Sequence, residues 1–266
     1  MANHESMSEP TAMRSLEPIR TVVLIPTYNE RETVSSLAQA TLQRQSELQN
    51  FDLRILIVDG NSHDGTQELV RALMEHDPRV QLLEIPERGL GLALTEGYRW
   101  AHQNMGAKII VQMDADLSHN PDYLPEMLLH IAQGYDLVVG SRYIQGGGIR
   151  DWPLRRRILS RAGNWVIRLI TGVWGFHDWT SGYRAFTIEL YKRLDHKSIG
   201  WRDFTVQSAF VYDAVCRGAR VKEVPIIFVN RHLGVSKMPV LRYSFNVVRY
   251  FVVARLRHLI RGRGRG

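Results

Sequence analysis

Residues 108–121 read KIIVQMDADLSHNP, an apolar run that ends in two aspartates one residue apart. A continuous apolar run such as Lys108–Met113 is typical of a strand that is buried on both faces of a parallel sheet. Polar residues begin where this run ends, with Asp114 and Asp116. Ligands bind beyond the carboxyl ends of the strands in open parallel sheets. The stretch therefore predicts a fold class and also the edge of the sheet where chemistry occurs.

The same pattern recurs on both sides of this stretch. Further apolar runs occupy residues 21–25, 53–58, 80–85 and 136–140, and helical stretches fill residues 30–48, 66–76, 92–105 and 121–133. Strands that alternate with helices predict an α/β fold, a mostly parallel twisted sheet with helices on both faces. The length of 266 residues suits one such domain, with or without an appendage.

Composition excludes several classes of protein. The hydrophobic share of 44% is that of a globular chain and not of a disordered one. The single cysteine, Cys216, excludes a disulfide framework and a cysteine-based zinc site. The first twenty residues have no apolar core, and no run of 18 apolar residues occurs, so we expect neither a signal peptide nor a transmembrane helix. These features predict a cytoplasmic protein.

Positive charge is concentrated near the C-terminus. The formal net charge is +7, and nine Lys or Arg residues lie in 224–266, where no Asp or Glu occurs. The rest of the chain is therefore slightly acidic. A nucleic-acid-binding protein more often spreads basic residues over its folded face, so no nucleic-acid partner is expected.

The C-terminal residues are apolar as well as basic. Residues 240–260 are rich in Val, Leu, Phe and Tyr and contain Arg242, Arg249, Arg255 and Arg257. This composition favours an amphipathic helix on an anionic membrane surface. The alternative is a helix that packs on the domain and ends in a disordered RGRGRG. We expect a flexible segment over 1–18, the α/β domain over 19–238 and a membrane-associating tail over 239–266.

The aspartate pair has two interpretations. Carboxylates at one strand end can converge on Mg²⁺ or Mn²⁺, which prefer hard oxygen ligands. They can also form an acidic turn that caps the helix near Pro121. Polar residues also follow the other apolar runs, and this common edge favours the metal site.

Other strand ends carry candidates for nucleotide binding. Asp59 can accept hydrogen bonds from a ribose or a base edge, and Tyr28 and Glu30 can stack on and bond a nucleobase. Residues 59–66 have, equally, the composition of a turn and helix cap, and Glu30 suits a helix N-terminus. Gly89-Leu90-Gly91 reads as a turn, because neither a G-x-G-x-x-G fingerprint nor a Walker A sequence is present.

Basic residues are frequent in the second half of the chain: Arg142, Arg155–Arg157, Arg184, Arg231 and Lys237. A run such as 155–157 is usually a solvated helix face. Arginines beside a metal also suit a pyrophosphate leaving group or a phosphate acceptor.

Eight segments together resemble the inverting family-2 glycosyltransferases of the GT-A fold, and among them the polyprenol-phosphate (dolichol-phosphate) mannosyltransferases. The segments follow the family's order over residues 20–238: VLIPTYNE (23–30), DGNSHDGT (59–66), GLGLA (89–93), MDADLSHNP (113–121), GSRY (140–143), RRRILSRAGN (155–164), DWTSGYR (178–184) and FVNRHLGVSK (228–237).

The resemblance implies transfer of mannose from GDP-mannose to a polyprenyl monophosphate, with inversion, by an enzyme peripheral on the cytoplasmic face of a membrane. It implies Mg²⁺ or Mn²⁺ on Asp114, Asp116 and Ser118, the acceptor phosphate on Arg156 and Ser160, and catalytic roles for Asp116, Arg142 and Arg231. The residues that it implies for the nucleotide sugar are Pro26, Tyr28, Glu30, Val58, Asp59, Gly60, Asp114, Ala115, Asp116, Arg142, Arg231 and Lys237.

Two positions depart from the family pattern. Gly60 stands where the family usually has a second acid, and Gln207 corresponds loosely to a family glutamate. A phosphate acceptor is already ionised at neutral pH, because the second pKa of a phosphomonoester is about 6, so no strong general base is required. Three alternatives stay open: transfer of glucose or another sugar from a UDP-sugar to undecaprenyl phosphate, polysaccharide synthesis, and a non-catalytic nucleotide-sugar-binding protein.

Overall fold

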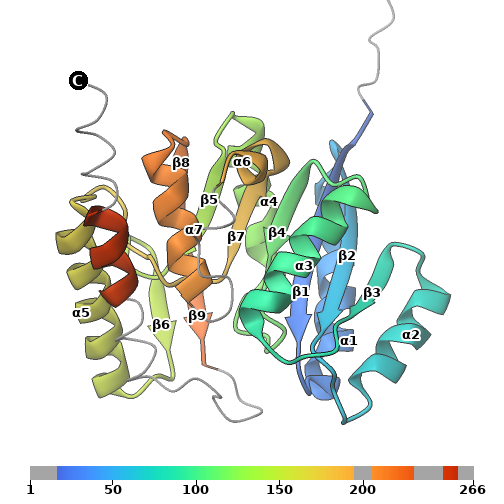
Figure 1. Cartoon of the computed structure of the whole chain (residues 1–266). Helices are drawn as coiled ribbons and strands as arrows, with labels where there is room; N and C mark the ends of the chain where they lie inside the picture. Colours follow the sequence, from blue (N-terminus) through green and yellow to red (C-terminus); the bar gives the residue numbers. More distant parts are fainter. Residues whose placement is uncertain (1–16, 195–204, 231–247, 257–266) are drawn as a thin grey trace, which may run out of the picture.

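A seven-stranded sheet runs through the molecule (Figure 1) in the order β3-β2-β1-β4-β7-β5-β8. The computed structural model describes residues 17–194, 205–230 and 248–256. The strands of this sheet are β1 (Ile19–Thr27), β2 (Phe51–Asp59), β3 (Val80–Glu84), β4 (Ile109–Gln112), β5 (Leu137–Ser141), β7 (Arg184–Thr187) and β8 (Val221–Pro225). Strand β7 is antiparallel to β4 and β5, whereas the other neighbours are parallel. Strands β6 (Gly148–Arg150) and β9 (Ile227–Val229) form a separate parallel pair.

Helices cover both faces of the sheet. One face packs against α1 (Arg31–Gln43), α2 (Thr66–His76) and α4 (Leu124–Ala132), and the other against α3 (Leu90–Gln103), α6 (Ile188–Arg193) and α7 (Thr205–Cys216). Helix α5 (Leu154–Thr171) lies at the β6–β9 end (Figure 1). Along β1, Val22 and Leu24 enter one core, and Val23 and Ile25 enter the other. Burial on both faces explains why residues 22–25 of this strand are all apolar.

The strands and helices predicted from the sequence are present. All five apolar runs are strands, within two residues at each end. The stretch 30–48 divides into α1 and a short 3-10 helix at Arg44–Glu47, and 121–133 divides into the 3-10 turn Pro121–Tyr123 and α4. The sequence did not predict β7, which has only four residues and lies between β4 and β5.

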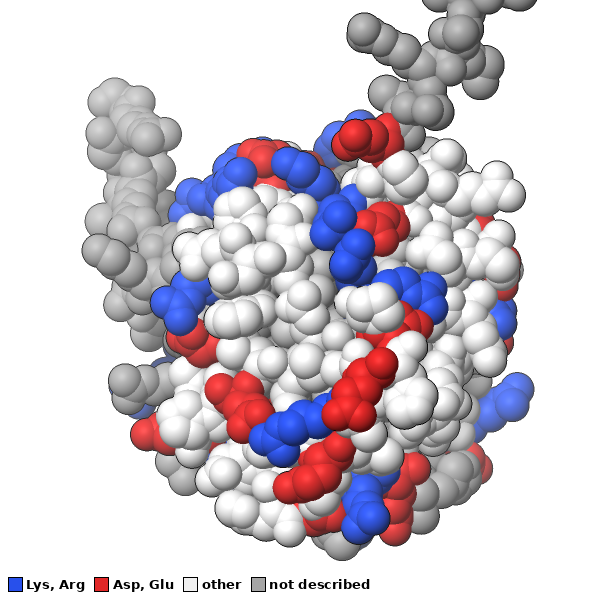
Figure 2. All heavy atoms as spheres, turned by 90° about the vertical axis from the view of Figure 1, so that its right-hand side faces the viewer, with Lys and Arg blue, Asp and Glu red and all other residues white. Residues whose placement is uncertain are grey.

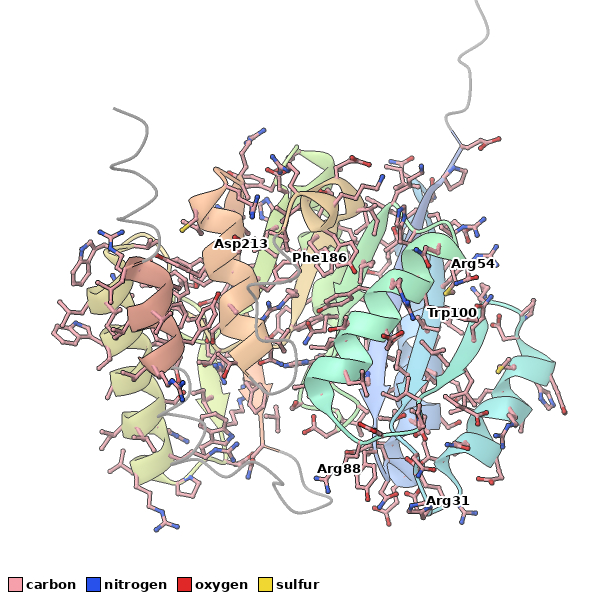
Figure 3. The ribbon with its side chains drawn as sticks, in the orientation of Figure 1. Arg31, Arg54, Arg88, Trp100, Phe186 and Asp213 are labelled. Atoms are coloured by element: carbon pink, nitrogen blue, oxygen red, sulfur yellow. The ribbon has the colours of Figure 1, made fainter. Side chains whose placement is uncertain are left out.

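The strand ends that carry polar residues lie next to one another. The register pairs Thr27 with Asp59 and Leu24 with Gln112, so β1, β2 and β4 end at one edge. In Figure 1 this is the lower edge, and in Figure 3 Arg31 and Arg88 lie there. Strand β7 begins at the same edge, because Arg184 pairs with Gln112 and Val139.

Part of the C-terminal segment is helical and packs on the domain. Within residues 248–256, Phe251 is fully buried, and its ring centroid lies 5.8 Å from that of Trp179 and 5.5 Å from that of Tyr212. Val248, Val252 and Leu256 on the same helix are exposed. The remainder of the predicted tail lies outside the described residues. In the described part of the chain, no helix combines the length and the apolar character needed to cross a bilayer.

Candidate functional site

The loops after β1 and β2 are joined through Asp59. This buried carboxylate accepts hydrogen bonds from Thr27 (2.8 Å), from the backbone and hydroxyl of Ser62 (2.8 and 2.6 Å) and from Gln67 (2.7 Å). Asn29 adds a second link, since its backbone N–H donates to the Ser62 hydroxyl at 2.8 Å. Asp59 thus fixes the turn after β2 against the end of β1, and a direct contact with a nucleoside stays a prediction.

Tyr28 lies on the same loop, under an arginine. The Arg88 guanidinium carbon is 4.3 Å from the centre of the Tyr28 ring, which is cation–π distance. Glu30 is the N-cap residue of α1, and its backbone N–H donates to the Thr66 hydroxyl at 3.1 Å. Val58 is fully buried in the core. Gly60 donates its backbone N–H to Thr27 at 3.0 Å.

The aspartate pair lies at the end of β4. Ser118 donates both its backbone N–H, at 3.1 Å, and its hydroxyl to Oδ1 of Asp116. The side chain of Ala115 points into the core. Leu117 has a left-handed backbone with φ of 62° and an exposed side chain. Such strain in a bulky residue is commonest at functional sites.

His119 contacts Asp114 through both nitrogens of its ring. The backbone N–H of Asp114 donates to Nδ1 of His119 at 2.9 Å, and Nε2 is 3.8 Å from Oδ2 of Asp114. The imidazole is stacked on Tyr183 with ring centroids 4.9 Å apart. Burial lowers the pKa of His119. The neutral ring therefore accepts at Nδ1 and carries its hydrogen at Nε2, on the side of the carboxylate.

Gly182 brings the segment before β7 against these groups. A β-carbon built on Gly182 would lie 2.9 Å from Nε2 of Gln207, 3.2 Å from Oδ1 of Asp114 and 3.3 Å from the His119 ring. The Gln207 carboxamide therefore lies close to the aspartate pair. An amide cannot take up a proton at neutral pH, so Gln207 supplies hydrogen bonds there and no base.

A basic cluster faces the acidic pair from β5 and α5. Arg142 follows β5, and Arg156 and Ser160 lie one turn apart on α5. The Arg156 guanidinium carbon is 3.8 Å from the Trp152 ring centre, and that of Arg142 is 5.6 Å from it. The Tyr143 hydroxyl donates to the Ser160 hydroxyl at 2.6 Å. Three residues predicted to bind phosphate thus share one aromatic frame.

Phe228 joins the basic cluster to the aspartate pair. Its ring centroid lies 5.7 Å from that of His119 and 5.4 Å from that of Trp152. The Arg142 guanidinium carbon is 5.5 Å from the same ring. Contacts through His119, Phe228 and Trp152 therefore link the aspartate pair to the guanidinium groups of Arg142 and Arg156.

The remaining predicted residues have varied positions. Arg155 and Arg157 are exposed, in agreement with a solvated helix face. Arg184 is buried and donates to the carbonyls of Gln207 and Ser181. Pro26 is half-buried on β1. Arg231 and Lys237 lie outside the described residues.

The family-model comparison matches residues 22–199, more than half of the chain, to glycosyl transferase family 2. The chain belongs to this family. The match includes most of β1 and every strand from β2 to β7, so the aspartate pair and six of the seven strands of the large sheet lie within it, wholly or in part.

Curated relatives of this family-2 transferase span most of its length. Polyprenol monophosphomannose synthase of Mycolicibacterium smegmatis is 39% identical over 232 residues, which are 86% of this chain and 84% of that protein. Undecaprenyl-phosphate mannosyltransferase of Micrococcus luteus is 36% identical over 241 residues, 89% of this chain and 96% of that protein. The group within the family that the sequence motifs resemble is the group to which these relatives belong.

A solved structure supports the fold. Glucosyl-3-phosphoglycerate synthase from Mycobacterium tuberculosis, in complex with Mn²⁺, UDP-glucose and phosphoglyceric acid, superposes with a TM-score of 0.64 at 18% identity, over 89% of this chain and 79% of that one. The GT-A fold predicted from the sequence is confirmed at this level.

Sequence reasoning missed several residues of the site, namely His119, Tyr143, Trp152, Asp178, Gly182 and Phe228. His119 had the clearest signal, since it lies five residues after Asp114 in the stretch that already indicated a metal site. The ten histidines of the chain have no metal-binding spacing, so their spacing did not mark this one. Tyr143, Asp178, Gly182 and Phe228 lie in segments that carry the family resemblance, but no role was assigned to them there, and Trp152 lies outside those segments. All five become neighbours only through the fold.

Proposed function

We propose that this family-2 transferase moves mannose from GDP-mannose to a polyprenyl monophosphate, inverting the anomeric carbon to give a β-linked product. The observation that carries the proposal is the series of ring contacts that links the aspartate pair, through His119, Phe228 and Trp152, to Arg142 and Arg156. Relatives named as mannose transferases to polyprenyl phosphates support the sugar and the acceptor class. GDP-mannose is the finer part of the proposal and rests on the resemblance in the sequence.

Asp114 and Asp116 fit a divalent cation. They present hard oxygen donors at one strand end, and Ser118 orients Asp116 through its hydroxyl. No group of three or more His, Cys, Asp or Glu ligands occurs among the described residues. Mg²⁺ is commonly held by one or two carboxylates together with substrate phosphates, so a two-carboxylate site is adequate. When bound, Mg²⁺ or Mn²⁺ supplies positive charge to the departing diphosphate.

The protein's own residues bind and orient the two phosphate groups. Arg156 and Ser160 hold the acceptor phosphate, Arg142 lies between acceptor and donor, and Arg231 and Lys237 complete the donor diphosphate site in this proposal. Charge-assisted bonds from arginine suit phosphate oxygens. The acceptor is ionised before it binds, which accords with a neutral Gln207 beside the aspartate pair. Tyr28, Glu30 and the loop built by Asp59 form the nucleoside end.

Transfer into the organic phase tests this proposal. Full-length protein, Mg²⁺ and polyprenyl phosphate in detergent are incubated with labelled GDP-mannose or, in parallel, labelled UDP-glucose. We expect solvent-extractable label from GDP-mannose only, and loss of that label in Asp116→Ala or in metal-free buffer. Lipid label from UDP-glucose alone would show that the donor is UDP-glucose and not GDP-mannose. The absence of lipid label from both donors would overturn the acceptor class.

We also propose peripheral attachment to the cytoplasmic face of a membrane, through the C-terminal segment together with α5. Exposed apolar side chains recur along one face of α5, at Leu154, Ile158, Trp165 and Leu169. The helix at 248–256 lies beside α5 in Figure 1, and Arg255 approaches Gly172 at the end of α5. Apolar stripes with arginines alongside suit an interfacial position at anionic lipid.

Flotation with vesicles that contain anionic lipid tests the attachment. We expect the double variant Trp165→Ser/Leu169→Ser to bind these vesicles to a smaller fraction than the wild type does. Leu129→Ser is the matched control, because Leu129 is equally exposed but lies on α4, on the opposite face of the sheet. Equal flotation of all three proteins would contradict the proposal.

A further inference from the structure

Arg142 is held in one orientation by a buried carboxylate. Its Nε and Nη2 atoms donate to Oδ2 and Oδ1 of Asp178, both at 2.7 Å, and its backbone N–H donates to Oδ2 at 3.0 Å. Nη2 also donates to the Thr180 hydroxyl at 2.7 Å. A bidentate pair of this kind fixes the plane of the guanidinium. The direction of Nη1 is then fixed as well, because the group is planar.

Asp178 is itself held by a second carboxylate. Oε1 of Glu223 accepts the backbone N–H of Asp178 at 2.9 Å, and Oε2 accepts the backbone N–H and the ring of His177 at 2.9 and 2.8 Å. Glu223 lies on β8 opposite Val139 of β5, the strand that ends just before Arg142. Glu223 thus connects the segment that carries Asp178 to the sheet that carries Arg142.

Helix α5 holds the same segment from the other side. The Asn164 carboxamide accepts the backbone N–H of Trp179 at 2.7 Å and donates to the carbonyl of Ser160 at 2.9 Å. Ser160 is one of the residues proposed for the acceptor phosphate. Residues 177–180 are therefore fastened to β8 and to α5 at once, with the Asp178 carboxylate fully buried between them.

We infer that Asp178 is a positioning residue that aims Arg142 at a phosphate group, and that Glu223 sets the place of Asp178. The inference rests on the proposed role of Arg142 as a phosphate ligand. A buried arginine without a counter-charge would be costly and free to turn. The bidentate pair with Asp178 offsets the cost of burying the guanidinium. It also holds the guanidinium in a single orientation, at the place where the proposal puts the acceptor and donor phosphates.

A double-mutant cycle tests the inference. The proteins are full-length wild type, Asp178→Asn, Arg142→Gln and the double variant. We expect Asp178→Asn to weaken binding of inorganic pyrophosphate with Mg²⁺ by about tenfold, the loss typical of one charge-assisted bond. Because Asp178 acts through Arg142, the same change should have little effect in the Arg142→Gln background. Calorimetry measures the four affinities, and lipid transfer measures kcat and KM.

Asp213→Asn is the control, since Asp213 accepts from Arg217 at 2.8 Å on α7, where Figure 3 labels it. Should Asp178→Asn fail to fold, Thr180→Val removes one bond to Arg142 and should show the same dependence on Arg142. Equal losses in both backgrounds, no loss at all, or no binding of pyrophosphate by the wild type would each overturn the inference. Coupled pyrophosphate affinities without lipid transfer would overturn the proposed function alone.

Discussion

At Gly182 the backbone lies close to Asp114 of the aspartate pair. A β-carbon there would be tighter than ordinary contact with Gln207, Asp114 and His119. We expect Gly182→Ala to displace the Asp114 carboxylate and to lower kcat by roughly 10- to 100-fold, the cost of a small misplacement in an active site. Steady-state transfer kinetics and Mn²⁺ affinity measure the effect.

Gly175→Ala is the matched control for this variant, because no atom lies within 4 Å of a β-carbon at Gly175. Both proteins should melt close to the wild type. Normal Mn²⁺ affinity and turnover in Gly182→Ala would contradict this account of the site.

Asp77 provides a test that depends on pH. The hydrogen bond from Arg79 lowers the pKa of Asp77. A lowered pKa stabilises the fold above the ordinary aspartate pKa, and the contribution disappears as the pH falls through the folded-state pKa. The pair is half-buried at the surface and partly screened by water, so we expect Asp77→Asn to lower the free energy of unfolding by less than about 1 kcal/mol at pH 7. In urea unfolding, the difference in free energy of unfolding between wild type and Asp77→Asn should disappear at acid pH. A difference that does not change with pH would refute the role of the Asp77 carboxylate.

Residues of the site that are contiguous in the sequence could be predicted. Asp114 and Asp116 follow an apolar run directly, so the end of a strand and a pair of carboxylates are visible together. Asp178 and Gly182 could not be found in this way. Asp178 meets Arg142 across 36 residues, and Gly182 has no side chain whose chemistry could mark it. The hydrogen bonds of Asp59 described above lie within the protein, and its predicted contact with a nucleoside stays a prediction.

At the scale of elements, α3 packs unusually close to the sheet. A β-carbon on Gly97 would overlap Leu24 and would lie 2.8 Å from a methyl group of Val58. Overpacking of a close-packed core costs typically 1–3 kcal/mol, so we expect Gly97→Ala to lower the free energy of unfolding by about that amount. Chemical denaturation measures it.

Gly163→Ala, in the middle of α5, is the control for a helical glycine in open space. It should raise stability by about 0.5–1 kcal/mol, since alanine favours the helix. Equal effects of the two substitutions on the free energy of unfolding would show that helix propensity, and not the distance to the sheet, determines the effect of Gly97→Ala.

The alternating first half of the chain was predictable because each strand is a continuous apolar run. The second half was not, since β7 is four residues long and pairs with strands far away in sequence. Tertiary neighbours, and not a local pattern, make this segment a strand.

At the scale of the whole molecule, the helix at residues 248–256 packs on the domain. Phe251 fills a place between Trp179 and Tyr212. We expect Phe251→Ala to lower the free energy of unfolding by about 3–5 kcal/mol, as for other buried phenylalanines. Val252→Ala, one residue away and exposed, should have little effect in the same urea titration. Similar stability of both variants would mean that this helix does not pack on the domain in solution.

The net positive charge of the chain does not make every face of the molecule basic. Figure 2 shows Lys and Arg beside Asp and Glu on the face that carries α2, and pairs such as Arg71 with Glu84, 2.7 Å apart, account for the mixture. A face of this kind offers no continuous cationic path for a nucleic acid.

The direction of β7 has a consequence for how this enzyme can be altered. The chain leaves the sheet after Ser141 and re-enters it at Arg184, and both points lie at one edge because β7 is antiparallel to β5. Everything in between, including β6 and α5, is thus a cassette with both ends on the same side. If the proposed acceptor-phosphate site at Arg156 and Ser160 is correct, we expect exchange of residues 142–183 for those of a relative to change acceptor choice and to leave the order of the strands as it is.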